Sequence, residues 1–382
     1  MKFKDSTEIN HRMRVFNEAA VINARIAEYI CMPIENNSIT FNAQSLRMNA
    51  KQFAKNMAKA GVSYSSSESL MAMFIMGLLS GSNEKVNLPN NVIHRIIKST
   101  RRFHPADILS NEYFDGIDFG NTKKGRCELC HDTFKANELF MYNTPVMSDG
   151  IMIPQIGSFS DEFTYPVIKE NYAAWMSVTP NEIFTMNKPI SKAKGKVITF
   201  GLGMGYFAFM AALKDNVQSV TIIENEPDMI SLFNDVILPQ FPDPGKIHII
   251  QADAYEYAEK LKDKEFDYCF VDIFRDNLDY LPYLRIKDII ENRLRKTPVD
   301  YWIEDSLMVT LSRFIWCVMY DEWSKYHEKD ATPELEELKA NLVINDNKQV
   351  IPLIRERFSK VTISRPDYIS YYMDYRNIRA VL

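Results

Sequence analysis

The second half of the sequence predicts an α/β fold, with a parallel sheet that is preceded by a β-hairpin segment and an N-terminal helical domain. From residue 196 onward, short apolar segments alternate with stretches of helical periodicity. A glycine-rich turn follows the first apolar segment, and residues 1–100 carry helical periodicity. Strands that alternate with helices are typical of a parallel sheet that helices cover on both faces.

Residues 1–100 are expected to form a helical accessory domain. Apolar residues recur at spacings of three and four over residues 8–29 and 45–60, as on the buried face of an α-helix. The serines and the glutamate at 65–68 offer a helix N-cap before the apolar run at 70–79. No segment of this region carries a pattern that indicates a chemistry.

Residues 101–195 are expected to form a connecting region with a β-hairpin and a helix. The hairpin is expected over residues 142–156, because Asp149-Gly150 separates two apolar segments there. An Asp-Gly pair in this position is a strong hairpin signal. The helix is expected over residues 165–175.

Residues 196–382 are expected to form the sheet domain. Its first five strands are expected at residues 197–200, 220–223, 247–251, 266–271 and 300–303. A long helix is expected over 307–323, followed by two closing strands at 361–364 and 377–381.

The turn after the first strand reads G-L-G-M-G, with glycines at Gly201, Gly203 and Gly205. Glycines let the chain turn tightly there and let its backbone approach a ligand. The helix that follows directs free N–H groups toward whatever binds. A dinucleotide-binding G-x-G-x-x-G pattern would need glycine at position 206, where this sequence has Tyr206.

Acidic residues stand at the ends of the next three strands. Glu224 follows the second strand at about the distance from the glycine turn where an acidic residue accepts both ribose hydroxyls. Asp253, followed by Ala254, ends the third strand, where a carboxylate can accept from an adenine amino group. Asp272 ends the fourth strand, beside the expected substrate cleft. The alternative roles are a helix-start carboxylate for Glu224 and a helix N-cap for Asp253, and one residue can serve both purposes.

This order of strand ends resembles a class I S-adenosylmethionine-dependent methyltransferase over residues 197–272. Upstream, residues 148–150 and the segment S-D-E-F-T-Y at 160–165 are similar to the hairpin and D-E-F-x-Y segment of spermidine synthases. The resemblance to the spermidine synthase group covers residues 142–280. It implies a Rossmann-like sheet whose cofactor, S-adenosylmethionine, is bound by Gly201, Gly203, Gly205, Glu224, Asp253 and Ala254.

Three departures from the spermidine synthases disfavour polyamine synthesis. Met204 stands where that family has an Asp that holds the amine of the decarboxylated cofactor. Tyr165 is followed by Pro and Val instead of His and Glu, and Arg275 replaces the second Asp that helps to hold the polyamine. Removing the partner of a desolvated ammonium costs about 3–5 kcal/mol. Methyl transfer is therefore favoured over aminopropyl transfer.

One departure concerns the methyltransferases themselves. They often carry Asp or Glu two residues before the first glycine, near the methionine moiety, where this sequence has Thr199. Asp161 or Glu162 is the alternative holder of the cofactor's amino group.

We therefore expect a transferase that moves a methyl group to an unidentified small or medium-sized acceptor. Asp272 is expected near the reacting centre, and Tyr165 and Arg275 are expected to contact the acceptor. A basic residue at position 275 suits an acceptor with a carboxylate or phosphate. The equal alternative is that Arg275 pairs with Asp276 or Asp279 at the surface. Aminopropyl transfer from decarboxylated S-adenosylmethionine, and a non-catalytic nucleotide-binding module, are the other functions left open.

Composition and charge argue against several kinds of partner. The net charge of −5 makes a broad basic surface for nucleic acid unexpected. The longest apolar run, at 70–79, is shorter than the ~18 residues that a membrane-spanning helix needs. The five cysteines lack regular spacing, and no apolar segment follows the first charged residues, which favours a reducing cytoplasm. We expect a small-molecule acceptor without nucleic-acid or membrane partners, and leave open a homodimer.

Cys127 and Cys130 form a C-x-x-C pair directly before His131. A structural zinc site needs four ligands, and the sequence has no second C-x-x-C pair. His131 or His104 would have to supply the missing ligands. Reduced structural thiols are favoured over zinc, so no metal site is expected.

Overall fold

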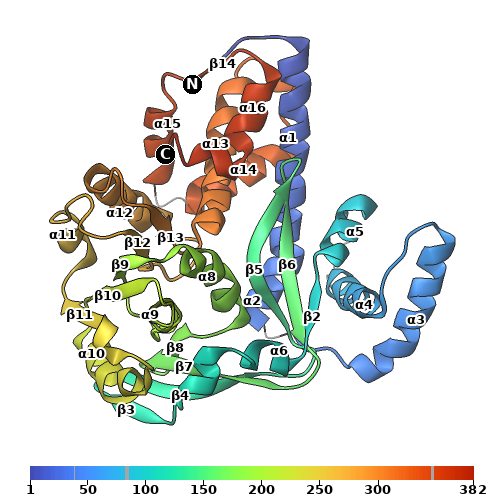
Figure 1. Cartoon of the computed structure of the whole chain (residues 1–382). Helices are drawn as coiled ribbons and strands as arrows, with labels where there is room; N and C mark the ends of the chain where they lie inside the picture. The colour runs from blue at the N-terminus through green and yellow to red at the C-terminus, as the bar shows by residue number, and fades with distance from the viewer. Residues whose placement is uncertain (38, 82–85, 346–347) are drawn as a thin grey trace. The chain divides into compact units, whose positions relative to one another are not determined.

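Two units make up the part of the chain that the computed structural model describes, which is residues 1–37, 39–81, 86–345 and 348–382 (Figure 1). The first unit contains residues 1–101, 139–156 and 305–382, and the second contains residues 102–138 and 157–304. The segment 305–382, which the sequence assigned to the sheet domain, thus groups with the N-terminal helices.

A five-stranded parallel sheet forms the centre of the second unit. Its strands are β9 (Gly195–Phe200), β10 (Val217–Glu224), β11 (Ile247–Gln251), β12 (Tyr268–Val271) and β13 (Val299–Tyr301). Their spatial order is β11-β10-β9-β12-β13, and every neighbouring pair is parallel. The predicted fold class, an α/β Rossmann-like sheet, is confirmed. The chain reverses direction across the sheet between β9 and β12, and ligands of such sheets bind at the carboxyl ends of the strands beside this switch point.

The helices next to this sheet in the sequence directly precede β9 or lie between its strands. They are α8 (Pro180–Lys192), α9 (Tyr206–Ala212), α10 (Pro227–Leu232), α11 (Ala254–Ala258) and α12 (Tyr280–Arg293), with short helical turns at Phe233–Ile237, Leu238–Gln240 and Pro244–Lys246. Successive residues of β9, such as Val197 and Ile198, are both fully buried. Burial on both faces of the sheet explains why its strands form continuous apolar runs in the sequence.

A second, antiparallel sheet corrects one prediction. Its strands are β3 (Thr122–Lys124), β4 (Cys127–Phe134), β7 (Phe163–Glu170) and β8 (Ala173–Ser177), in that spatial order. The helix predicted over residues 165–175 is wrong, because this segment is the β7–β8 hairpin. Asn171 and Tyr172 turn the chain with φ of 50° and 69°, and β7 pairs with β4 from Phe163 to Glu170. Pairing with β4, which is distant in the sequence, therefore determined the secondary structure of this segment against its local periodicity.

The predicted Asp-Gly hairpin is confirmed. Its strands are β5 (Leu139–Ser148) and β6 (Ile151–Phe159). Asp149 and Gly150 have φ of 55° and 78°, which is the backbone of a two-residue hairpin turn. The remaining short elements of this stretch are β2 (Arg101–Phe103), α6 (Pro105–Leu109) and α7 (Glu112–Gly116).

The N-terminal part of the first unit is helical, as predicted. Its helices are α1 (Thr7–Ile26), a π-helical turn (Ala27–Cys31), α2 (Met32–Asn37), α3 (Ala43–Lys59), α4 (Ser66–Ser80) and α5 (Asn90–Lys98). The predicted N-cap precedes α4, where the Ser65 Oγ accepts the Glu68 N–H at 3.1 Å and the Glu68 carboxylate accepts the Ser65 N–H at 2.6 Å. Met71, Phe74 and Ile75 of α4 are buried in the apolar core of this unit.

The C-terminal part of the first unit begins with the predicted long helix. The elements after β13 are α13 (Glu304–Ser324), a short turn (Glu328–Asp330), α14 (Pro333–Asn345), α15 (Val350–Arg357), β14 (Thr362–Ile363), α16 (Pro366–Met373) and α17 (Tyr375–Ile378).

The two predicted closing strands of the parallel sheet are wrong. β14 pairs with the N-terminal strand β1 (Lys2–Phe3) instead of joining that sheet. The segment 377–381 follows the start of α17, whose first turn is capped by Asp374 accepting the Arg376 N–H at 3.0 Å. A short apolar segment does not specify its partner strand, because that choice depends on residues far away in the sequence.

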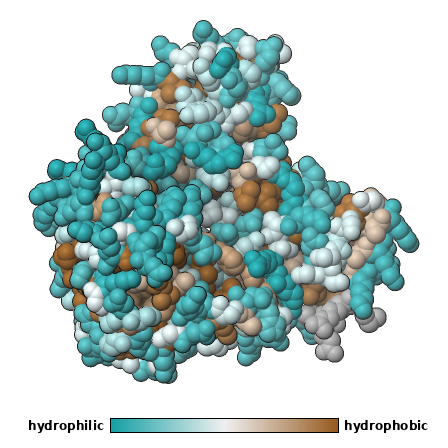
Figure 2. Space-filling view, in the orientation of Figure 1, coloured by the Kyte–Doolittle hydropathy of each residue, from teal (hydrophilic) through white to brown (hydrophobic). Residues whose placement is uncertain are grey.

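The face of the molecule in Figure 2 consists mostly of hydrophilic side chains, with apolar ones interspersed. Within the described ranges, no helix combines the length and the apolar character needed to cross a membrane.

Candidate functional site

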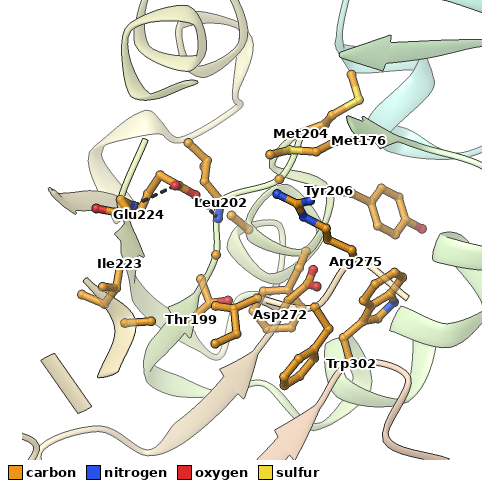
Figure 3. A pocket seen from close by; sticks show the side chains of 18 of the residues that line it. Met176, Thr199, Leu202, Met204, Tyr206, Ile223, Glu224, Asp272, Arg275 and Trp302 are labelled. Carbon is orange, nitrogen blue, oxygen red and sulfur yellow. Dashed lines mark hydrogen bonds between the residues drawn. The ribbon is translucent and has the colours of Figure 1, made fainter. Parts of the chain in front are cut away.

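A cavity of about 430 Å³ lies at the carboxyl edge of the parallel sheet (Figure 3). Most of the site residues predicted from the sequence line it: Gly201, Gly203, Glu224, Asp253, Ala254, Asp272 and Arg275. Gly205 and Tyr165 are not among the lining residues. Four consecutive strand ends of the sheet therefore contribute to one cavity.

The glycine turn has a backbone that other residues would adopt only with strain. Gly201, Gly203 and Gly205 have φ of 94°, 52° and 79°, in the left-handed region that favours glycine. A Cβ at Gly201 would lie 1.9 Å from the Asp272 carbonyl oxygen, and one at Gly205 would lie 2.4 Å from the Phe233 ring. A Cβ at Gly203 would meet no atom within 4 Å, so this residue leaves room for a ligand. Gly205 thus packs against Phe233 and does not line the cavity.

Two side chains from α7 and the residue before it hold the glycine turn in place. The Tyr113 hydroxyl donates to the Met204 carbonyl at 2.6 Å, and the Asn111 amide donates to the Tyr206 hydroxyl at 3.0 Å. Tyr113 is fully buried, and its ring meets that of Tyr206 edge to face at 5.2 Å. Nothing in the sequence around residues 111–113 distinguishes these contacts from ordinary packing.

Glu224 connects the end of β10 to the glycine turn. One carboxylate oxygen accepts the Leu202 N–H at 3.0 Å, and the other accepts the N–H groups of Asn225 and Glu226 at 2.7 and 2.8 Å (Figure 3 shows the bond to Leu202). A carboxylate offers about four acceptor positions. Glu224 therefore stabilises the local backbone and retains capacity for a ligand hydroxyl.

Asp253 has the helix N-cap role, one of the two roles that the sequence left open for it. Its Oδ1 accepts the Glu256 N–H at 3.0 Å, which caps α11. The same residue lines the cavity together with Ala254, the first residue of α11. The second carboxylate oxygen is thus left for a ligand amino group while the first holds the helix.

Asp272 follows β12 at the centre of the cavity wall. Its N–H donates to the Phe200 carbonyl at 2.7 Å, which continues the β9–β12 pairing by one residue. Burial, and secondly the negative charge of Glu224, raise the pKa of Asp272 to about 7. A carboxyl group with a pKa near neutrality can both hold and release a proton during a reaction.

Glu182 is a second carboxyl group in the same cavity and, like Asp272, is partly buried. We did not predict it from the sequence. It lies in the first turn of α8, where it accepts the Thr179 N–H at 3.1 Å. Burial raises its pKa to about 8, and the negative charge of Asp272 also raises it, against the lowering effect of hydrogen bonds from Thr179 and Ser177. The pattern Thr-Pro-x-Glu at 179–182 signals a helix start, but only the tertiary structure brings Glu182 beside Asp272.

Arg275 lies along the cavity in Figure 3, with its guanidinium toward Met204 and Tyr206. Arg275 does not form the alternative surface ion pair with Asp276 or Asp279 in this structure. The Asp279 carboxylate accepts the backbone N–H of Arg275 at 2.7 Å, and that of Asp276 accepts the Leu278 N–H at 2.7 Å. In the described chain, the Arg275 guanidinium makes no ion pair.

Aromatic and thioether side chains complete the cavity wall beside Arg275. Trp175, Met176 and Trp302 line it, and the Trp302 indole N–H donates to the Thr185 hydroxyl of α8 at 2.9 Å. Tyr165 lies in β7, where its ring stacks on Phe134 at 5.0 Å. The structure therefore does not bring Tyr165 to the cavity.

The residues considered as holders of the cofactor's amino group do not all lie at the cavity. Thr199 lines the cavity from β9 and is 3% exposed. Asp161 and Glu162 are not lining residues, and Asp161 lies 3.6 Å from the exposed His104.

The C-x-x-C pair lies within strand β4. Side chains alternate between the two faces of a strand, so residues three positions apart point to opposite faces. Cys127 is 1% exposed, and burial raises the pKa of its thiol to about 11. No cluster of three or more His, Cys, Asp or Glu side chains suited to a metal ion occurs among the residues that the structure describes.

Comparisons with known proteins match parts of this chain to solved structures. No protein-family model and no curated protein matches the sequence. Among solved structures, spermidine synthase from Thermotoga maritima matches at 18% identity over 34% of this chain and 49% of that chain, with a TM-score of 0.25. The precorrin-6y C5,15-methyltransferase from Geobacter metallireducens matches at 19% over 32% and 63%, with a TM-score of 0.26.

A putative caffeoyl-CoA O-methyltransferase from Staphylococcus aureus matches at 15% identity over 44% of this chain and 73% of that chain, with a TM-score of 0.25. The chain spans less than two thirds of the length of the spermidine synthase and of the precorrin methyltransferase. Our fold assignment rests on this chain's own strand order and glycine turn. These features define a Rossmann-like parallel sheet.

Replacing Gly201 tests the close approach of β9 to the end of β12. Gly203→Ala should lower the free energy of unfolding by about 1–2 kcal/mol, because only the left-handed backbone is strained. Gly201→Ala should lower it by roughly 3 kcal/mol more, since its Cβ would lie 1.9 Å from the Asp272 carbonyl oxygen. Urea unfolding curves measure both, and equal losses in the two variants would contradict this account.

The raised pKa values of the two partly buried carboxyl groups predict a pH dependence of stability. A carboxyl group whose pKa is higher in the folded chain stabilises the fold at low pH, and this contribution is lost as the pH rises through the folded value. Glu182, with a pKa raised from 4.5 to about 8, should therefore destabilise the fold increasingly from pH 5 to pH 8. Relative to the wild type, Glu182→Gln should gain about 2–4 kcal/mol in free energy of unfolding over this range.

Denaturant unfolding at each pH measures this gain. Glu256→Gln, which replaces an exposed carboxylate outside the cavity, is the control and should follow the wild type. If the free energy of unfolding of Glu182→Gln changes with pH as that of the wild type does, Glu182 does not have a raised pKa.

Proposed function

We propose that the second unit binds S-adenosylmethionine and transfers its methyl group to a small or medium-sized acceptor, as a cytoplasmic enzyme. The observation that carries this proposal is the convergence of four strand ends on one cavity. The glycine turn follows β9, Glu224 ends β10, Asp253 follows β11 and Asp272 follows β12.

The residues on the β10–β11 side suit the nucleoside part of this cofactor. Glu224 has acceptor capacity for ribose hydroxyls beyond the three N–H groups it already accepts. Asp253 has an oxygen for the adenine amino group, and the backbone of Ala254 lies next to it. The open space at Gly203 lets the turn approach the ligand. When bound, the cofactor supplies a methyl group on a positively charged sulfur.

Asp272 is suited to hold and move the acceptor's proton. It lies on the cavity wall between the nucleoside side and Arg275 (Figure 3). Its pKa of about 7 lets the carboxylate orient an amine or hydroxyl and accept its proton at an Oδ atom near neutral pH. Displacement of this kind depends mainly on positioning, and the backbone of Asp272 is held against Phe200 and Gly201.

A second candidate function is aminopropyl transfer to a polyamine. Glu182 favours it, because it adds a carboxyl group next to Asp272 that the sequence comparison with spermidine synthases did not provide. Met204 and Arg275, which both line the cavity, argue against it. A thioether cannot pair with an ammonium, and a guanidinium repels one. The large cavity beside Asp272 also speaks against a non-catalytic binding module.

Binding of S-adenosylhomocysteine is the first test. It should bind in calorimetric titration, whereas NADH should not. Glu224→Gln should weaken binding by roughly ten-fold or more, because a charged acceptor of the ribose hydroxyls is lost. Glu256→Gln, at an exposed position outside the cavity, is the control. Binding of NADH in place of the sulfur nucleoside would refute the proposal.

Incubation with decarboxylated S-adenosylmethionine and putrescine separates the two transfer reactions. We expect no spermidine by mass spectrometry, because Arg275 opposes a dication in the acceptor region. Arg275→Asp restores the acidic residue type that spermidine synthases carry there, and it should be the variant in which any aminopropyl transfer appears. Spermidine formed by the wild type would reverse the order of the two candidates.

A further inference from the structure

The cavity has two halves with different chemistry. The glycine turn follows β9, Glu224 ends β10 and Asp253 follows β11, and they form the half that suits a nucleoside. The other half lies at the ends of β12 and β13. We call it the acceptor pocket, and define it by Glu182, Asp272, Arg275, Trp175 and Trp302. Figure 3 shows Glu224 on one side of Asp272 and Trp302 on the other, with the Arg275 guanidinium toward Met204.

The acceptor pocket contains an acidic pair without a cation. Asp272 and Glu182 come from β12 and α8, and each lines the cavity. In the described part of the chain, neither carboxyl group forms an ion pair with a Lys, Arg or His side chain. Negative charges that are close and desolvated oppose each other. Their pKa values are both raised, with the charge of Asp272 contributing at Glu182. A cationic group of a ligand would relieve this repulsion.

The same pocket contains a cation without an anion. The guanidinium of Arg275 extends along the cavity (Figure 3). The nearby carboxylates of Asp276 and Asp279 accept backbone N–H groups instead of pairing with it. Arg275 is exposed, and the planar fork of donors of a guanidinium matches a carboxylate or phosphate.

Aromatic rings also line the cavity. Trp302 is fixed by its hydrogen bond to Thr185, one turn beyond Glu182 on α8. Trp175 lines the same region. An indole face is the aromatic surface that attracts ammonium groups most strongly, and it also packs against a short apolar chain.

We propose that the acceptor pocket binds a zwitterionic acceptor of the amino-acid class, with its amine toward Asp272 and Glu182 and its anionic group toward Arg275. A diamine would place an ammonium against Arg275, and a dianion would place a negative charge against the acidic pair. A zwitterion is the small ligand that satisfies both ends of the pocket. This inference rests on the proposed transferase function, because it concerns the acceptor of that reaction.

The test is calorimetric titration of the full chain loaded with S-adenosylhomocysteine. The probes are ω-amino acids from β-alanine to 6-aminohexanoate, each compared with the alkylamine and the alkanoate of equal length. Phosphoethanolamine is included to separate a phosphate from a carboxylate as the anionic group. At least one amino acid or phosphoethanolamine should bind about ten-fold or more tightly than both analogues that carry a single charge.

Two variants test which residue binds each end of the ligand. Arg275→Gln should abolish the preference over the alkylamine, and Glu182→Gln should abolish the preference over the alkanoate. Gln is accepted in the N-cap pattern that Glu182 completes, so α8 is expected to remain folded. Arg293→Gln, at an exposed position outside the cavity, is the matched control. All three variants should bind S-adenosylhomocysteine within about two-fold of the wild type.

The outcomes separate this inference from the proposed function. If the wild type does not bind S-adenosylhomocysteine, the proposed function fails and the inference fails with it. If that ligand binds but no zwitterion binds more tightly than its singly charged analogues, only the inference is overturned. A loss of S-adenosylhomocysteine affinity in Arg275→Gln would show that Arg275 holds the carboxylate of the cofactor, which also overturns the inference.

Discussion

The site depends on the contact between the ends of strands β9 and β12. At Gly201 the backbone lies so close to the Asp272 carbonyl that a Cβ would be 1.9 Å from its oxygen. The Asp272 N–H donates to the Phe200 carbonyl at 2.7 Å. This close approach places the glycine turn and the carboxyl group of Asp272 next to the same switch point, where the chain reverses across the sheet. A larger residue at position 201 would separate the glycine turn from the end of β12.

A second constraint is electrostatic. The carboxyl edge of the sheet gathers Glu224, Asp253 and Asp272, and α8 adds Glu182. The protein uses hydrogen bonds to stabilise part of this charge. Glu224 accepts three backbone N–H groups, whereas Asp272 and Glu182 are desolvated and hold protons more strongly than usual. The cavity therefore has one side where a carboxylate is held by backbone N–H groups and another where two carboxyl groups have raised pKa values, which is a pattern that functional sites often contain.

Comparison of particular elements shows which features local sequence can predict. The parallel strands were found because they are apolar runs bounded by turns, and Asp149-Gly150 was found because the turn requires φ above zero. The segment 165–175 was mistaken for a helix, since its pairing with β4 depends on residues about thirty positions earlier. The short strand β14 was assigned to the wrong sheet for the same reason, because its partner β1 lies at the opposite end of the chain.

The order of the strand ends, the glycine turn and the three carboxylates that follow it can be predicted from local patterns, because each stands next to an apolar run. Three features depend instead on how the chain folds: Glu182 lies beside Asp272, Tyr165 stacks in the antiparallel sheet, and Arg275 faces the cavity without a carboxylate partner. The physical reason is that a side chain's neighbours and solvation are set by elements distant in sequence, whereas its place in a strand or turn is set by the residues next to it.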